Sequence, residues 1–167
     1  MELTLRPIFQ QGRVEEGIHH LRAALALNPF NIMAHNNLGF ALASQGKTGE
    51  ALGHYREVLW INPNCALAHN NWGYALACQN KLDDAIGHYR QALQLDPRYA
   101  MARVNLRNAL LSRATAYATG GRFPEAAQSA REAAGLSGVG QDKELTERIA
   151  KRIAAYETRQ SYHEREP

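Results

Sequence analysis

The side chains of this sequence that are best suited to chemistry are histidines that recur in pairs. His35 and His54 are separated by the same interval as His69 and His88. Neutral imidazole is the commonest metal ligand in proteins. The two members of each pair fall in different predicted helices, however, and no third ligand completes a known metal-binding pattern. We therefore predict that these histidines pack or face solvent, and that the chain binds no metal.

The sequence contains no catalytic motif. There is no Ser-His-Asp order, no glycine-rich phosphate loop and no HExxH segment. Cys65 and Cys78 are thirteen residues apart, which is about 20 Å along a helix at ~1.5 Å per residue. That distance is too long for a disulfide bond. We expect two free thiols, no cofactor and no enzymatic activity.

The composition is that of one soluble globular domain. Of 167 residues, 45% are hydrophobic and 21% are charged, and the net charge is only +3. The basic residues form no block, so we expect no nucleic-acid partner. No apolar run reaches the roughly 18 residues of a membrane helix, and Met1–Gln10 lacks the pattern of a signal peptide. We expect no direct membrane insertion; a cytoplasmic or periplasmic part of a larger protein remains open.

An interval of 34 residues organises the middle of the chain, where Ile32–Cys65 aligns with Ala66–Tyr99 without a gap. The best-matched stretches are His35–Ala43 with His69–Ala77, and Glu50–Arg56 with Asp84–Arg90. Apolar residues follow helical spacing on both sides of Gln45-Gly46-Lys47 and of Gln79-Asn80-Lys81. Gly and Asn accept the left-handed conformation that ends a helix. Each unit is therefore predicted to be a pair of helices.

Small and large residues recur at fixed places in these units. Gly39 and Gly73 allow the helices to approach closely, Tyr55 and Tyr89 fill the space between them, and a proline closes each unit. These residues resemble the tetratricopeptide-repeat (TPR) family. The resemblance implies an all-α fold: a right-handed TPR superhelix, or α-solenoid, of about three helical hairpins with a C-terminal capping helix.

The resemblance divides the chain, taken as a single TPR domain over residues 1–167, into five parts. These are a partial first repeat at 12–31, repeats at 32–65 and 66–99, an elongated repeat at 100–136 and a capping helix at 142–160. We expect Pro7 to block a continuous helix over Met1–Gln11. Arg107 replaces the glycine of the earlier units, which makes close packing there doubtful. The next turn, Gly120-Gly121, comes seven residues late, which predicts one long helix from about Tyr99 to Thr119.

The C-terminal segment has another pattern. Gly135–Gly140 is predicted to be a loop, and Asp142 to cap a helix with a single apolar stripe, as the end of a solenoid requires. The stripe consists of Leu145, Ile149, Ile153 and Tyr156. The last part of the chain, Ile153-Ala-Ala-Tyr156 followed by Ser161-Tyr162-His163-Glu164, resembles the C-termini of some bacterial TPR proteins whose N-terminal half is a membrane glycosyltransferase.

Asparagine recurs at Asn37, Asn71 and Asn105 in the first helix of each unit. In the TPR family these helices line the concave face, and an amide can pair with both backbone groups of an extended peptide. The pattern resembles the asparagine ladder of O-linked N-acetylglucosamine transferases. The alternative is that these amides bond neighbouring helices. The predicted peptide-binding residues are Asn36, Asn37, Phe40, Asn70, Asn71, Tyr74, Asn105 and Asn108.

The predicted function is a protein–protein interaction scaffold that binds an extended peptide or a partner protein in the concave groove. Some TPR co-chaperones hold the acidic C-terminal tail of a partner with Lys and Arg side chains in this groove, an arrangement called a carboxylate clamp. We do not expect such a clamp here, since the corresponding places hold Asn36, Phe40, Met101 and Asn105. Two alternatives remain. One is a self-assembling module, a homo-oligomer formed through an open solenoid end at Ile18, Leu21 and Leu25. The other is the substrate-recognition tail of a larger glycosyltransferase.

Overall fold

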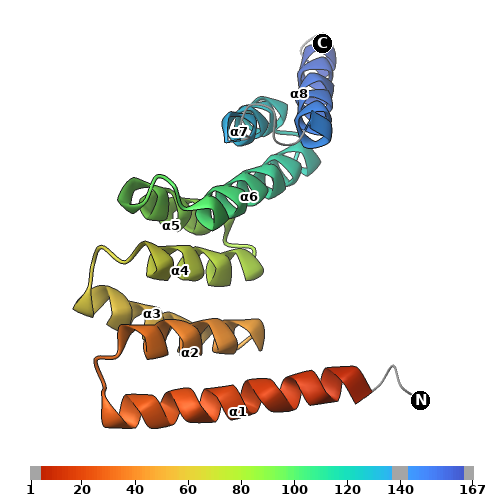
Figure 1. Cartoon of the computed structure of the whole chain (residues 1–167). Coiled ribbons are helices and arrows are strands. Elements are labelled where there is room, and N and C mark those ends of the chain that lie inside the picture. Colours follow the sequence, from red (N-terminus) through yellow and green to blue (C-terminus); the bar gives the residue numbers. More distant parts are fainter. Residues whose placement is uncertain (1–4, 137–142, 164–167) are drawn as a thin grey trace.

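The chain folds into α-helices in the computed structural model, which describes residues 5–136 and 143–163, with side chains for residues 13–136 and 143–159. The helices are α1 (Leu5–Leu27), α2 (Ile32–Ser44), α3 (Thr48–Ile61), α4 (Ala66–Cys78), α5 (Leu82–Leu95), α6 (Ala100–Thr119), α7 (Phe123–Gly135) and α8 (Lys143–His163). They stack in chain order as consecutive hairpins (Figure 1). The predicted all-α fold is confirmed. Within the described ranges, no helix is long and apolar enough to cross a bilayer.

The turn inside each hairpin is built around one residue with positive φ. These residues are Gly46 (φ 77°), Asn80 (φ 59°) and Gly121 (φ 74°). Such a conformation favours Gly and is tolerated by Asn, because a larger Cβ substituent clashes with the backbone. In the first turn the Lys47 N–H then donates to the Leu42 carbonyl at 2.9 Å, which satisfies a carbonyl at the helix end. The predicted turns therefore lie where the glycines and asparagine placed them.

The junctions between hairpins share a second kind of turn. A side-chain oxygen of Asn or Asp, immediately before proline, accepts a hydrogen bond from the N–H two residues later. The three bonds run from the Phe30 N–H to Asn28 (3.1 Å), from the Asn64 N–H to Asn62 (3.1 Å) and from the Arg98 N–H to Asp96 (3.0 Å). The next helix starts soon after each turn, at Ile32, Ala66 and Ala100.

The two helices of the α2–α3 and α4–α5 hairpins are in contact through a glycine and a tyrosine. A Cβ atom added to Gly39 would lie 2.6 Å from Cε1 of Tyr55, and one added to Gly73 would lie 2.8 Å from Cε1 of Tyr89. Both tyrosines are fully buried. The glycine is thus required by packing, since it leaves room for the aromatic ring to lie against the backbone of the facing helix.

The third hairpin replaces this glycine–tyrosine contact with two alanines. Ala114 of α6 lies seven residues before the positive-φ turn residue, as Gly73 does in α4, and Ala130 of α7 takes the place of Tyr89. Both alanines are fully buried. The two extra turns of α6 therefore put Ala114, and not Arg107, at the glycine's distance from the turn residue, while Arg107 itself is half-buried.

Helix α1 differs from the expected partial repeat. It runs without interruption from Leu5 to Leu27, so neither Pro7 nor the glycine at position 12 breaks it. Pro7 is the third residue of this helix. In the first turn a backbone N–H has no partner within the helix, and the missing proton of proline costs little there.

The apolar side of α1 is covered by α2. Ile18 is only 2% exposed and packs with Leu38 and Leu42, and Leu21 and Leu25 pack partly against the same cluster. The expectation that these residues form an open apolar end was wrong for Ile18. Leu21 and Leu25 are half-buried, as expected for residues that are partly uncovered.

The last helix, α8, packs against α7 and buries Ile149 of the predicted stripe completely. Arg131 of α7 forms an ion pair with Glu157, and Arg152 donates to Thr115 of α6. The helix thus covers the end of the stack, as expected for a capping element. The predicted Asp142 cap and most of the predicted loop before it lie outside the described residues.

The glycine–tyrosine contact predicts the effect of two matched substitutions. Gly73→Ala should destabilise the chain by about 1–3 kcal/mol, because the added methyl group overlaps the Tyr89 ring and the site is already close-packed. Gly53→Ala, on α3 where nothing lies within 4 Å of an added Cβ, should instead stabilise it by about 0.5–1 kcal/mol. Urea unfolding measures both; equal effects of the two substitutions would contradict the account.

Candidate functional site

The first helices of the hairpins, α2, α4 and α6, form one row, which we call the inner row. The rings of Phe40 on α2 and Tyr74 on α4 are 5.9 Å apart between centroids. On the other side of α4, the Asn105 side chain on α6 donates to the Asn70 oxygen at 2.9 Å. The corresponding faces of three helices therefore meet along this row, which is the surface that the repeat pattern predicted as the binding face.

Exposed apolar side chains lie along the inner row. We call them the inner strip: Met33 (58% exposed), Phe40 (50%), Tyr74 (36%), Met101 (58%) and Val104 (39%). The spacing of Met33 and Phe40, and of Met101 and Val104, places each pair on one face of its helix. The aromatic and methionine side chains are thus open to solvent and not buried between adjacent helices. Leu67, which stands in α4 where Met33 stands in α2, is half-buried.

The inner row carries little charge. Neither α2 nor α4 contains a single Asp, Glu, Lys or Arg. Charged side chains enter the row only in α6, where Arg103 donates to the Pro97 carbonyl at 2.6 Å. A ligand along α2 and α4 is therefore met by apolar groups and neutral amides, and an acidic tail finds no cation there.

The predicted asparagines divide by accessibility. Asn37 and Asn108 are exposed, and Asn105 is half-buried. Asn70 and Asn71 are buried; the Asn70 amide donates to Asn71 at 3.2 Å and accepts from Asn105. Three of these amides thus form a chain between α4 and α6, which is the interhelical alternative, and only part of the predicted ladder faces solvent.

Asn36 does not lie at the margin of the inner row. It is fully buried, and its nitrogen lies 3.8 Å from Cys65 Sγ, while its oxygen is buried without a hydrogen-bond partner among the described residues. It is therefore out of reach of a peptide. The binding role of the remaining predicted residues stays a prediction.

The two cysteines are free thiols, Cys65 half-buried and Cys78 exposed. Cys78 lies one helical turn after Tyr74, and the charge and hydrogen bond of this thiol raise the pKa of the Tyr74 hydroxyl. Because its one O–H is engaged with Cys78, the Tyr74 oxygen can accept, rather than donate, a hydrogen bond from a ligand on the inner strip.

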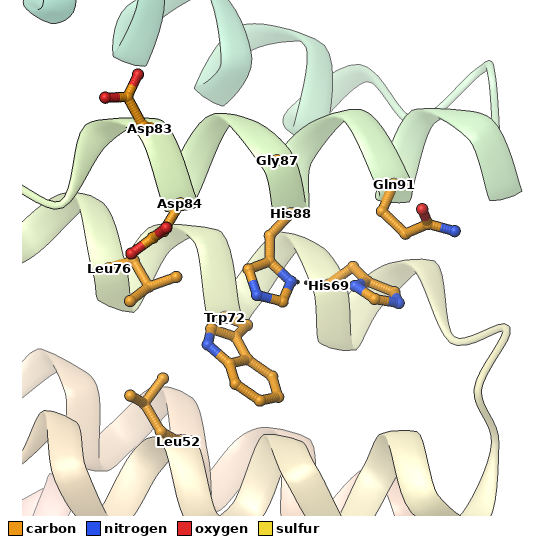
Figure 2. A pocket seen from close by; sticks show the side chains of 9 residues that line it. All are labelled: Leu52, His69, Trp72, Leu76, Asp83, Asp84, Gly87, His88 and Gln91. Carbon is orange, nitrogen blue, oxygen red and sulfur yellow. Dashed lines mark hydrogen bonds between the residues drawn. The ribbon is translucent and has the colours of Figure 1, made fainter.

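Each histidine pair is a direct contact between the two helices of a hairpin. His35 and His54 approach through their Nδ1 atoms at 2.9 Å, and His69 and His88 at 3.1 Å (Figure 2). His35 Nε2 lies 2.9 Å from the Pro29 carbonyl. A carbonyl only accepts, so this nitrogen carries a proton; in that neutral tautomer of the ring, the His35 Nδ1 accepts from His54.

Burial keeps the second pair and His54 neutral. Desolvation by burial lowers the pKa of His54, with a further lowering from nearby His35. Burial likewise lowers the pKa of His69 and of His88. No three His, Cys, Asp or Glu side chains of the described part of the chain form a group that would hold a metal ion. The pairs are therefore helix-to-helix hydrogen bonds. Their repeat spacing was visible in the sequence, but their contact was not.

The third hairpin shows that such a pair is replaceable. Counted from the turn residue, Leu110 stands where His69 does and Ser129 stands where His88 does. Leu110 and Ser129 are both buried, and Ser129 accepts a hydrogen bond from Arg113 at 3.0 Å. An apolar residue and a hydroxyl therefore fill the same positions between the helices.

Comparison with known proteins assigns this architecture to a class. Residues 32–65 and 66–99 each match the family described as tetratricopeptide repeat, and residues 8–46 match a TPR repeat family. The matched residues together extend from 8 to 99, and they coincide with stacked helical hairpins. The chain is a repeat protein of helical hairpins. It belongs to the tetratricopeptide-repeat family, whose members generally mediate protein–protein interactions.

Solved structures share the fold. A crystal structure of MamA protein matches with a TM-score of 0.62 at 18% identity, over 91% of this chain and 76% of that one. The first TPR of Spaghetti (RPAP3), bound to the HSP90 peptide SRMEEVD, matches with a TM-score of 0.57 at 25% identity, over 66% of this chain and 86% of that one. An O-GlcNAc transferase of Thermobaculum terrenum matches with a TM-score of 0.59 at 28% identity, over 72% of this chain but only 23% of the transferase. No curated protein matches the sequence.

The lowered histidine pKa values predict a pH effect on stability. Because the folded state binds these protons less tightly than the unfolded chain, stability should fall as the pH drops below the unfolded value of about 6.5. The double variant His69→Leu/His88→Ser, which copies the third hairpin, should lose less stability over the same range. Urea midpoints at pH 7.5, 6.5 and 5.5 measure this, and parallel curves for the two proteins would contradict it.

Proposed function

We propose that this TPR protein binds an extended, uncharged and partly apolar segment of a partner protein along the inner strip, without catalytic chemistry of its own. The observation that carries the proposal is the set of five exposed apolar side chains on three adjacent helices. Two of them, the rings of Phe40 and Tyr74, are in contact across two helices, and large exposed apolar side chains that gather on one face often serve an interaction.

The chemistry of the strip favours an adaptable contact with side chains. Met33 and Met101 have flexible, polarisable side chains that fit irregular apolar surfaces, while Phe40 and Tyr74 are large anchors of the type that dominates binding energy. The exposed Asn37 amide between Met33 and Phe40 can donate to and accept from a peptide backbone. Because the helices are already packed, little order has to be imposed on binding.

The absence of charged residues from α2 and α4 supports an uncharged ligand. The RPAP3 module was solved with a peptide that ends in two glutamates, a valine and an aspartate. In this chain α2 and α4 offer no Lys or Arg to such carboxylates. An acidic tail would lose its hydration there without gaining an ion pair, so we do not propose an acidic-tail receptor.

The similarity to the O-GlcNAc transferase supports one alternative function: the chain would be the substrate-recognition tail of a larger glycosyltransferase. It rests on 28% identity over a fraction of that protein. The coding sequence upstream of the Met1 codon tests it: an in-frame glycosyltransferase domain is expected from this alternative, and its absence would remove it. Self-assembly through α1 stays a second alternative, because Leu21 and Leu25 are only half-buried, although Ile18 is buried within the chain.

Peptide selection followed by substitution tests the proposed function. Peptides selected from a random 12-residue library on the immobilised chain should be rich in apolar residues. Phe40→Ala and Tyr74→Ala should each raise their Kd by about tenfold or more, the equivalent of ~1.4 kcal/mol, as expected for aromatic anchors. Fluorescence anisotropy measures the Kd.

Gln94→Ala on α5 is the matched control, because this side chain is exposed and lies outside the inner row. It should leave the Kd unchanged. Selected peptides that bind equally well to the Phe40 and Tyr74 variants would refute binding along the inner strip.

A further inference from the structure

A groove on the other side of the stack, between α3 and α5, is separate from the inner strip. It encloses about 710 Å³, with α4 as its floor. Its lining consists of Leu52, His69, Trp72, Leu76, Asp83, Asp84, Gly87, His88 and Gln91. Figure 2 shows Trp72 lying between Leu52 and the His69–His88 pair. The Trp72 and His88 rings stack at 4.7 Å with 17° between their planes.

At the corresponding place one repeat earlier, an arginine of α1 pairs with a carboxylate of α3. The Arg22 guanidinium on α1 lies 3.7 Å from the Glu50 carboxylate on α3. Glu50 stands one repeat before Asp84, at the equivalent position of its helix. Beside it, Arg22 contributes to lowering the pKa of His54, the equivalent of His88. At this place a guanidinium of the chain is therefore paired with the carboxylate and lies near enough to the imidazole to affect its pKa.

The groove between α5 and α7 also contains arginines. Arg113 rises from α6, at the position that Trp72 has in α4 when counted from the turn residue. Its guanidinium contacts Asp83 at 3.0 Å and Glu132 at 3.7 Å, and Arg90 contacts Glu132 at 2.7 Å. Guanidinium groups paired with carboxylates therefore occur on both sides of the central groove.

The central groove is lined by two carboxylates: Asp83 is paired with Arg113, whereas Asp84 has no cation beside it among the described residues. Among the described residues its lining includes no Lys or Arg, and Asp84 forms no ion pair. Arg56 has the position in α3 that Arg22 has in α1, but its side chain is exposed and outside the lining. The lining histidines have pKa values lowered by burial, so they do not offset the acidic charge at neutral pH.

We propose that the α3–α5 groove binds an arginine side chain from a partner protein, with its guanidinium paired to Asp84 and packed against Trp72. A planar guanidinium suits a carboxylate beside an aromatic ring, because it donates in a fixed fork and stacks on aromatic faces. Its aliphatic stem would cover Leu52 and Leu76. The site is independent of the inner strip, and it gives a partner a second, charge-dependent contact on the opposite side.

Binding of a short model peptide tests this site. Acetyl-Ala-Arg-Ala-amide is titrated into ¹⁵N-labelled protein at pH 7.5 and low salt, and the amide and indole signals of Trp72, Gly87 and Gln91 are followed. Saturable shifts are expected with the arginine peptide. The matching citrulline peptide, which keeps the shape and loses the charge, should bind at least about tenfold more weakly, and the lysine peptide should also bind more weakly.

Variants separate the site from general charge attraction. Asp84→Asn and Trp72→Leu, which introduces the residue of the preceding repeat, should each raise the Kd at least about fivefold. Glu50→Gln, whose carboxylate is already paired with Arg22, should leave it unchanged. Circular dichroism melting confirms that each variant folds.

Three results would overturn the proposal. The first is equal binding of the arginine and citrulline peptides. The second is an Asp84→Asn variant with unchanged affinity. The third is absence of binding to the wild type together with binding to Arg56→Gln, which would show that the chain's own Arg56 fills the groove.

Discussion

The contact on which the rest of the structure depends is the close approach of the two helices within a hairpin. Gly39 and Gly73 allow the rings of Tyr55 and Tyr89 to lie against the helix backbone, and the histidine pairs join the same helices by a hydrogen bond. Because each pair of helices is held so closely, hairpins stack as rigid units, and α2, α4 and α6 come side by side.

This arrangement leaves two sides with different chemistry. The inner row presents apolar and neutral side chains, because α2 and α4 contain no charged residue. On the other side the second helices diverge, and carboxylates and arginines meet between them. The central groove differs from this pattern: Trp72 stands where Arg113 stands in the next hairpin, and Asp84 forms no ion pair among the described residues. A partner that uses both sides would combine an apolar contact with a charged one.

Much of the fold could be predicted from the sequence, because the deciding interactions are local. Gly46 and Asn80 mark turns, Asn62-Pro63 marks a junction, and the 34-residue interval places equivalent helices. The predicted helix break at Pro7 was wrong, because a proline in the first turn of a helix is tolerated and the sequence did not show that α1 starts at Leu5. At Arg107 the alignment by repeat interval did not place the small residue, because α6 has two extra turns. Counted from the turn residue, the position of Gly73 corresponds to Ala114.

The site was harder to predict than the fold. Helix α4 packs against helices on several sides, so its sequence does not distinguish an inner from a buried face. Asn71 and Asn37 are equivalent in sequence, yet Asn71 is buried beside the amide chain to Asn105, while Asn37 is exposed. Phe40 and Tyr74 were predicted on the correct face, since helical spacing from the asparagines sufficed to place them.

The most direct test of the central claim uses the methionine methyl groups. The chain has three methionines, and Met33 and Met101 lie at opposite ends of the inner strip. Methyl spectra of ¹³C-methionine-labelled protein are recorded with a selected peptide, and signals are assigned with Met33→Leu and Met101→Leu. The account predicts that both methyl signals shift along one binding curve. A peptide that binds tightly and shifts neither signal would contradict it.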